Sequence, residues 1–150
     1  MTEFLTTAQG RRIAYHRSAG QGPKSGLGIV FLGGFKSDMG GTKAVHLEAW
    51  AKAQGRAVLR FDYSGHGESS GDFLDGCIGD WFADALAAIT TLTTGPQVLV
   101  GSSMGGWIAL LLARAVPQMN VCTESMPVKA LAGLMVFGLT CHLMAVHISN

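Results

Sequence analysis

The sequence predicts an α/β protein in which a mostly parallel sheet has helices on both faces. Two observations carry this prediction. Short unbroken apolar runs, typical of strands buried on both faces, alternate with longer segments whose apolar residues recur at helical spacing. Clusters of glycine, serine and proline separate the two kinds of segment. Because strand–helix alternation is typical of right-handed parallel crossovers, we expect one sheet built in this way.

The expected elements follow in a regular order. Phe4–Thr7 and Arg12–Arg17 flank a turn and are expected to form a hairpin. The strands expected after the hairpin are Gly28–Leu32, Ala57–Phe61 and Gln97–Val100, and the helices expected between and after them are Lys43–Gln54, Ile78–Leu92 and Met104–Val116. The last helix is apolar nearly all round, so we expect it to be covered on most sides.

Composition favours one folded domain of 150 residues, with 48% hydrophobic and 14% charged residues. The net charge of +1, with acids and bases interspersed, gives no indication of a nucleic-acid partner. The three cysteines lie far apart, which favours a reducing compartment. Met1–Arg17 contains Glu3 and no apolar run, so it matches neither a signal peptide nor a transit peptide. The expected location is therefore cytoplasmic.

Residues 118–150 differ from residues 1–117, because they contain only two charged side chains. We therefore predict two parts, a folded part at 1–117 and an atypical tail at 118–150. Within the tail, Ala130–Phe137 is a candidate for one further strand. Residues 130–148 carry no charge and are long enough to span a bilayer, but their histidines and glycines disfavour membrane insertion.

The segment Gly101-Ser102-Ser103-Met104-Gly105 fits the pattern Gly-x-Ser-x-Gly, with Ser103 at the serine position. A strand is expected to end at Gly101 and a helix to begin directly after Ser103, which is the context of a nucleophile elbow. Such a turn strains the backbone of the serine and exposes its hydroxyl above the sheet. The alternative is a loop that only turns the chain or binds a phosphate at the helix N-terminus.

A serine that attacks a carbonyl also needs hydrogen-bond donors for the oxyanion that forms. At such an elbow one donor is the N–H of the following residue, here Met104, and the other comes from the loop after the third strand. Phe35, which follows Gly33 and Gly34 at the end of an apolar run, is the residue expected there. The alternative for the two glycines is an ordinary turn at a strand end.

Four other residues are candidates for partners of the serine. Asp62 and His66 lie in a glycine- and serine-rich loop after an expected parallel strand, where unusual backbone angles are needed. We therefore interpret both as structural. His16 lies in an outer strand and His46 on a helix that starts far from the elbow, so both are interpreted as surface or core residues.

A resemblance to a known family is carried mainly by Gly41–Ala44, Arg60–Gly65 and Val100–Ser103. These stretches resemble the palmitoyl-protein thioesterases of the α/β-hydrolase superfamily, also described as acyl-glucuronide esterases, and their bacterial relatives. The resemblance covers about residues 3–117. It implies a partial α/β-hydrolase fold without the last strands and lid, Ser103 as nucleophile with the two oxyanion donors named above, and hydrolysis of acyl esters or thioesters.

The family places its triad acid and histidine after later strands. Downstream of Ser103 the only acid is Glu124, and the only histidines, His142 and His147, lie too early to match the family's position. We therefore assign no triad acid or histidine and interpret the tail as a truncation or a change of frame after about residue 118. Because a serine without a general base keeps its proton at neutral pH, the chain is expected to be weakly active or inactive.

Two functions are consistent with these observations. The first is a serine hydrolase that forms an acyl-enzyme with a small-molecule or protein-linked acyl ester or thioester. The second is a non-catalytic fragment that binds an acyl group or a partner. No metal or organic cofactor is implied. Self-association through an exposed sheet edge is expected in either case.

Overall fold

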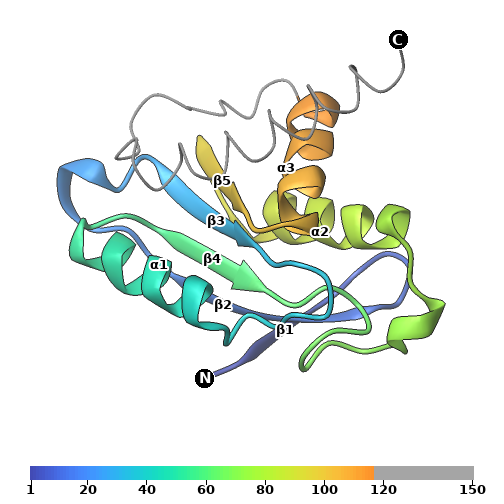
Figure 1. The fold of residues 1–150 in the computed structure, drawn as a ribbon. Coiled ribbons are helices and arrows are strands. Elements are labelled where there is room, and N and C mark those ends of the chain that lie inside the picture. The colour runs from blue at the N-terminus through green and yellow to red at the C-terminus, as the bar shows by residue number, and fades with distance from the viewer. Residues whose placement is uncertain (117–150) are drawn as a thin grey trace, which may run out of the picture.

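The structure, a computed structural model, describes residues 1–116 (Figure 1). The predicted tail at 118–150, with its candidate strand Ala130–Phe137, lies outside the described residues. The strands are β1 (Glu3–Thr6), β2 (Arg12–Ser18), β3 (Gly28–Leu32), β4 (Val58–Phe61) and β5 (Gln97–Gly101). The helices are α1 (Thr42–Ala53), α2 (Ile78–Leu92) and α3 (Met104–Ala115), with short 3-10 turns at Gly22–Lys24 and Phe73–Asp75.

The five strands form one sheet in the order β1-β2-β4-β3-β5. β3 lies between β4 and β5 and is parallel to both, whereas β2 is antiparallel to β4 and to β1. The register pairs Ile29 with Val58 and Leu32 with Gly101. The carboxyl ends of β3 and β5 therefore meet at one edge of the sheet, where loops in α/β proteins form their sites.

The helices cover both faces of the sheet, as predicted: α1 lies on one face and α2 and α3 on the other (Figure 1). β3 is buried along its whole length because it has a strand on each side and helices above and below. The larger core lies under α2 and α3 and includes Val30, Leu32, Ile89, Ile108 and Leu112.

All predicted elements within the described residues are present, with boundaries within one residue of those expected. The expectation that α3 is covered on most sides is wrong for its outer face. Ile108 and Leu112 are fully buried, but Trp107 and Leu110 are 65% and 75% exposed. Within the described part, α3 packs on one side only, against β3, β5 and α2. Among residues 1–116, no helix combines the length and apolar character needed to cross a membrane.

Candidate active site

Ser103 occupies the sharp turn between β5, which ends at Gly101, and α3, which begins at Met104. Its backbone angles are φ 56° and ψ −117°, a region that residues with a Cβ rarely adopt. Ser103 precedes the first turn of α3, yet its side chain makes no capping hydrogen bond to that turn. The side chain is exposed, so its hydroxyl is open to a ligand.

Two glycines make this turn possible. A Cβ on Gly101 would collide with the backbone of Gly105 and Gly106, and a Cβ on Gly105 would collide with the carbonyl groups of Leu32 and Gly33. The elbow is therefore packed directly against the end of β3. Because backbone atoms cannot move aside as a flexible side chain can, any residue other than glycine would displace the turn.

The loop after β3 passes beside the elbow. The Ser102 N–H donates to the Leu32 carbonyl at 3.0 Å, which ties the end of β5 to the end of β3. A Cβ on Gly34 would lie 3.1 Å from the Ser102 carbonyl oxygen and 3.6 Å from the Cβ of Ser103. Phe35, the predicted second oxyanion donor, is the next residue along this loop.

The N–H groups of Phe35 and Met104 are the predicted oxyanion donors. In the part of the chain that the structure describes, neither forms a hydrogen bond with another residue. Met104 follows Ser103 in the sequence, and Phe35 follows Gly34, which lies next to Ser103 in the fold. Their role as oxyanion donors stays a prediction. The carboxyl-terminal edge of the sheet also holds Lys43, whose Nζ lies 3.4 Å from the Ser102 hydroxyl.

Asp62 is buried and accepts two backbone hydrogen bonds. Its Oδ1 accepts from the Met39 N–H at 2.6 Å and its Oδ2 from the Glu68 N–H at 3.0 Å. Burial raises the pKa of Asp62 above its ordinary value, although these two bonds act in the opposite direction. Asp62 therefore holds loops together, as the sequence indicated.

His66 is also buried and bonded away from the serine. Its Nε2 lies 3.3 Å from the Lys36 backbone N and its Nδ1 lies 3.1 Å from the Ser64 carbonyl oxygen. Both ring nitrogens are thus engaged by backbone groups. Neither Asp62 nor His66 is brought to Ser103 as an acid or base.

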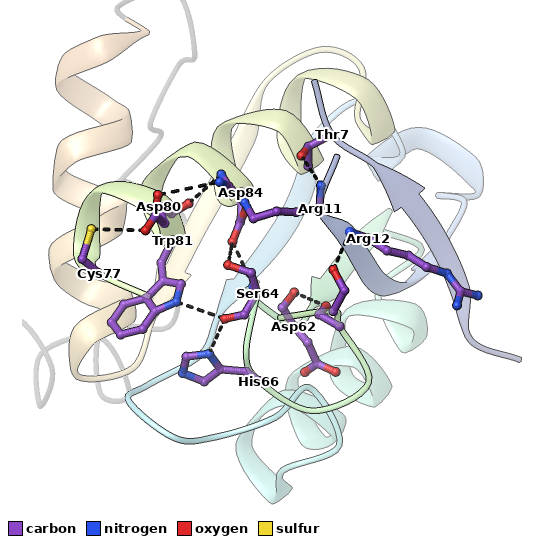
Figure 2. Close-up of polar contacts among 12 residues, drawn as sticks. Thr7, Arg11, Arg12, Asp62, Ser64, His66, Cys77, Asp80, Trp81 and Asp84 are labelled. Atoms are coloured by element: carbon purple, nitrogen blue, oxygen red, sulfur yellow. Dashed lines mark hydrogen bonds and ion pairs between the residues drawn. The ribbon is translucent and has the colours of Figure 1, made fainter. Parts of the chain in front are cut away.

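Asp84 is the polar centre of this region, and the sequence analysis did not single it out (Figure 2). It is fully buried in α2 and accepts from Arg11 Nε at 2.6 Å and from the N–H and hydroxyl of Ser64 at 2.9 and 2.6 Å. Trp81 Nε1 donates to the Ser64 carbonyl at 3.0 Å. The signal in the sequence was a single acid within the buried apolar face of a helix, because buried carboxylates are found only with partners.

The two remaining histidines of the described part lie elsewhere. His16 in β2 has its Nε2 3.1 Å from the Thr2 hydroxyl, and burial lowers the pKa of His16 below its ordinary value. His46 is an exposed residue of α1. Both positions agree with the interpretation as core or surface residues. Among residues 1–116, no group of three or more His, Cys, Asp or Glu side chains is arranged to hold a metal ion.

The strand order, the strained serine between β5 and α3 and the glycine loop beside it define an α/β-hydrolase fold. A family model described as "Alpha/beta hydrolase family" matches residues 29–143, and the chain belongs to this family. The predicted resemblance and fold class are thereby confirmed.

Among curated proteins, the chain is similar to "Palmitoyl-protein thioesterase ABHD10, mitochondrial" of Bos taurus and of Mus musculus. The identities are 44% and 43% over 115 residues. The alignments cover 77% of this chain but only 36% and 37% of those proteins, so the chain spans about a third of their length.

Solved structures give the same result. The alpha/beta hydrolase domain-containing protein 10 from mouse has a TM-score of 0.73 and 41% identity, over 79% of this chain and 46% of that one. A putative hydrolase from Agrobacterium vitis S4 also has a TM-score of 0.73 and 41% identity, over 78% of this chain and 46% of that one. A thioesterase domain from the curacin biosynthetic pathway has a TM-score of 0.64 and 26% identity, covering 79% and 43%.

The predicted cytoplasmic location is wrong by this comparison, because the mammalian relatives are named mitochondrial. The prediction rested on the composition of Met1–Arg17 and on the cysteines.

Proposed function

We propose that this chain is the nucleophile-bearing part of a serine hydrolase that cleaves acyl esters or thioesters through an acyl-enzyme on Ser103. The observation that carries the proposal is the backbone conformation of Ser103, with φ 56° between β5 and α3. Such a conformation costs on the order of 1–3 kcal/mol and persists where a function needs it. The names of the relatives, which are palmitoyl-protein thioesterases, support the acyl substrate class.

The reaction has two steps. The Ser103 Oγ attacks the acyl carbon, and the N–H groups of Phe35 and Met104 stabilise the negative oxygen of the tetrahedral intermediate. The bond to the alcohol or thiol then breaks, the leaving group takes up a proton, and the acyl group stays on Ser103. Water repeats the attack on the acyl-enzyme and releases the carboxylic acid. A general base must accept the serine proton in the first step and the water proton in the second.

We propose that residues 1–116 do not supply that base. Their buried acids and histidine are Asp62, Asp84 and His66, and all three are occupied by backbone or side-chain partners other than Ser103. Glu124, His142 and His147 lie outside the described residues. We assign no triad acid or histidine and propose that the 150-residue chain by itself hydrolyses its substrates barely above background.

We propose that residues 1–117 form this nucleophile-bearing unit and that 118–150 are an atypical tail. Its partner is a small-molecule or protein-linked acyl ester or thioester, not a nucleic acid. Among the described strands, β5 pairs with β3 on one side and has no neighbour on the other. This edge supports self-association as a property of the isolated chain.

Labelling with a fluorophosphonate probe tests the role of Ser103. The wild-type chain, Ser103→Ala and Ser102→Ala are each incubated with the probe, and the adducts are located by mass spectrometry. Slow labelling at Ser103 is expected in the wild type and in Ser102→Ala, and none in Ser103→Ala. If the wild type carries no adduct on Ser103, the proposal fails, and a non-catalytic fragment that binds an acyl group or a partner becomes the better description.

A further inference from the structure

Three side chains from the loop after β4 bind the loop that carries Phe35. The bonds are from Tyr63 Oη to the Gly33 carbonyl (3.2 Å), from the Lys36 N–H to His66 Nε2 (3.3 Å) and from the Met39 N–H to Asp62 Oδ1 (2.6 Å). The three bonds attach the beginning, the middle and the end of one short loop. This loop, residues 33–39, is called the oxyanion loop below.

The peptide unit that bears the Phe35 N–H is fixed from both sides. Its carbonyl, that of Gly34, accepts from the Ser37 hydroxyl at 2.7 Å and from the Ser37 N–H at 3.2 Å. In a trans peptide the N–H points opposite to the carbonyl, so these bonds direct the Phe35 N–H to the other side. The next peptide unit is held by the bond from the Lys36 N–H to His66.

Two non-glycine residues among those described have a positive φ: Ser103 and Lys36, both at 56°. A lysine does not adopt this conformation without compensation, because its Cβ crowds the backbone. The bond to His66 is the only one that the Lys36 N–H makes within residues 1–116. His66 thus supplies the one bond that holds the strained Lys36 N–H itself, next to Phe35.

The surroundings of His66 fix which ring nitrogen carries the proton. Nδ1 faces the Ser64 carbonyl, an acceptor, and Nε2 faces the Lys36 N–H, a donor. The partners therefore assign the neutral ring with its proton on Nδ1. Ser64 itself donates two hydrogen bonds to the buried Asp84 of α2, so the imidazole ring is connected to α2 through Ser64 (Figure 2).

We propose that His66 is a positioning residue of the reaction: its neutral imidazole holds the oxyanion loop so that the Phe35 N–H faces the oxygen bound at Ser103. This inference rests on the proposed function of Ser103. His66 does not move a proton in it. It acts through the backbone of Lys36, and its effect is on the transition state, where the oxyanion forms.

Two substitutions separate this role from packing. His66→Phe keeps an aromatic ring in contact with Phe73 and Trp81, whose ring centroids lie 5.3 and 5.1 Å from that of His66, but removes the acceptor. His66→Gln restores an acceptor at about the reach of Nε2. His46→Phe, on the exposed surface of α1, is the matched control.

The first measurement is amide hydrogen exchange of the wild-type and variant chains by NMR. In His66→Phe the Lys36 amide should exchange at least about tenfold faster, since it has lost its acceptor. The Met39 amide, bonded to Asp62 in the same loop, should be unchanged and so reports that the loop has not unfolded. His66→Gln should restore slow exchange at Lys36. Unchanged exchange of Lys36 in His66→Phe would overturn the proposal.

The second measurement is the rate of fluorophosphonate labelling at Ser103 in the same chains. Loss of one oxyanion donor typically lowers rates by about 10²- to 10³-fold, so a misplaced donor should cost His66→Phe about 10- to 100-fold. His66→Gln should recover to within about threefold, and His46→Phe should match the wild type. Faster Lys36 exchange with an unchanged labelling rate overturns the positioning role. Absence of labelling in the wild type, with the exchange effect intact, overturns the function of Ser103 and with it this role.

Discussion

Asp84 accepts two hydrogen bonds from Ser64 and a third from Arg11, although Arg11 precedes it by 73 residues and Ser64 by 20. The carboxylate thereby joins the turn of the hairpin, the loop after β4 and the helix α2. Removing the carboxylate of such a network is strongly destabilising, because the buried Ser64 loses its acceptor and Arg11, whose side chain is only 22% exposed, loses its counter-charge.

We predict that Asp84→Ala lowers the free energy of unfolding by about 3–5 kcal/mol. The control is Asp80→Ala, because Asp80 is 41% exposed and lies 3.7 Å from Arg11, and it should cost under about 1 kcal/mol. Urea denaturation at pH 7 measures both. Equal losses for the two variants would show that the buried network does not stabilise the fold.

Two neighbouring glycines at the elbow, Gly105 and Gly106, provide another variant with a matched control. A Cβ on Gly105 would collide with the Leu32 carbonyl, whereas a Cβ on Gly106 has its nearest neighbour, the Gly101 oxygen, at 3.8 Å. We predict that Gly105→Ala destabilises the chain by more than about 2 kcal/mol. Gly106→Ala should be neutral or stabilising by up to about 1 kcal/mol, because alanine favours helix. Thermal unfolding, monitored by circular dichroism, measures both variants. Equal losses of stability in the two variants would contradict the prediction.

Glu48 predicts a dependence of stability on pH. Burial raises the pKa of Glu48, but the hydrogen bonds and charges of Lys52 and Arg60 outweigh it and lower the pKa below the ordinary 4.5. A carboxyl group whose pKa is lower in the folded than in the unfolded chain stabilises the fold at pH values above its unfolded pKa. This stabilisation is lost as the pH falls through its folded pKa. Glu48→Gln should therefore be less stable than the wild type at pH 7, with the difference shrinking below about pH 4.5. Urea midpoints between pH 7 and 3 test this, and a difference that grows on acidification would be incompatible with it.

The proposed absence of a base predicts the activity of the isolated chain. Hydrolysis of a p-nitrophenyl ester and of a palmitoyl thioester should be barely above background, because triad members act as a unit worth on the order of 10⁴- to 10⁶-fold. Residues 1–117 continued with the carboxy-terminal part of the mouse relative should be active, and Ser103→Ala in that chimera should abolish turnover. Comparable Ser103-dependent turnover by the 150-residue chain would contradict this. His142 or His147, oriented by Glu124, would then have to serve as the base.

Within residues 1–116, β5 has a neighbouring strand on one side only, and this edge and the exposed outer face of α3 predict self-association. Leu110 is 75% exposed on α3, and Val45 on α1 is 45% exposed. Leu110→Lys should reduce association at micromolar concentration, and Val45→Lys should do so less, because it lies on the opposite face of the sheet. Analytical ultracentrifugation measures both. A monomeric wild-type chain with a sharp, reversible unfolding transition would count against this prediction.

Most of the fold could be predicted because its signals are local. The apolar run of β5, the glycines of the elbow and the apolar spacing of α3 are contiguous in sequence, so the turn at Ser103 follows from neighbours alone. The expected boundaries of helices and strands lie within one residue of the observed ones for the same reason. The alternation of strands and helices also predicted parallel pairing and helices on both faces.

The contacts that hold the candidate site could not be predicted in this way. The bond from Lys36 to His66 spans 30 residues and that from Arg11 to Asp84 spans 73, and both depend on which strands become neighbours. Composition of the loop after β4 indicated a structural turn for Asp62 and His66 but not which backbone groups they would bind. The positive φ of Lys36 likewise follows from tertiary contacts, because nothing in a lysine favours it.

The positive φ of Ser103 lowers the stability of the chain, because a serine is strained in this conformation. Glycine adopts such angles freely, whereas every other residue pays with its Cβ. A chain with glycine at this position would lack the hydroxyl but would be more stable than the natural chain. It would also be more stable than a chain with alanine there, because alanine keeps the Cβ. Selection for folding alone would therefore remove the serine. A serine in this strained conformation is therefore what the proposed role of Ser103 as nucleophile predicts.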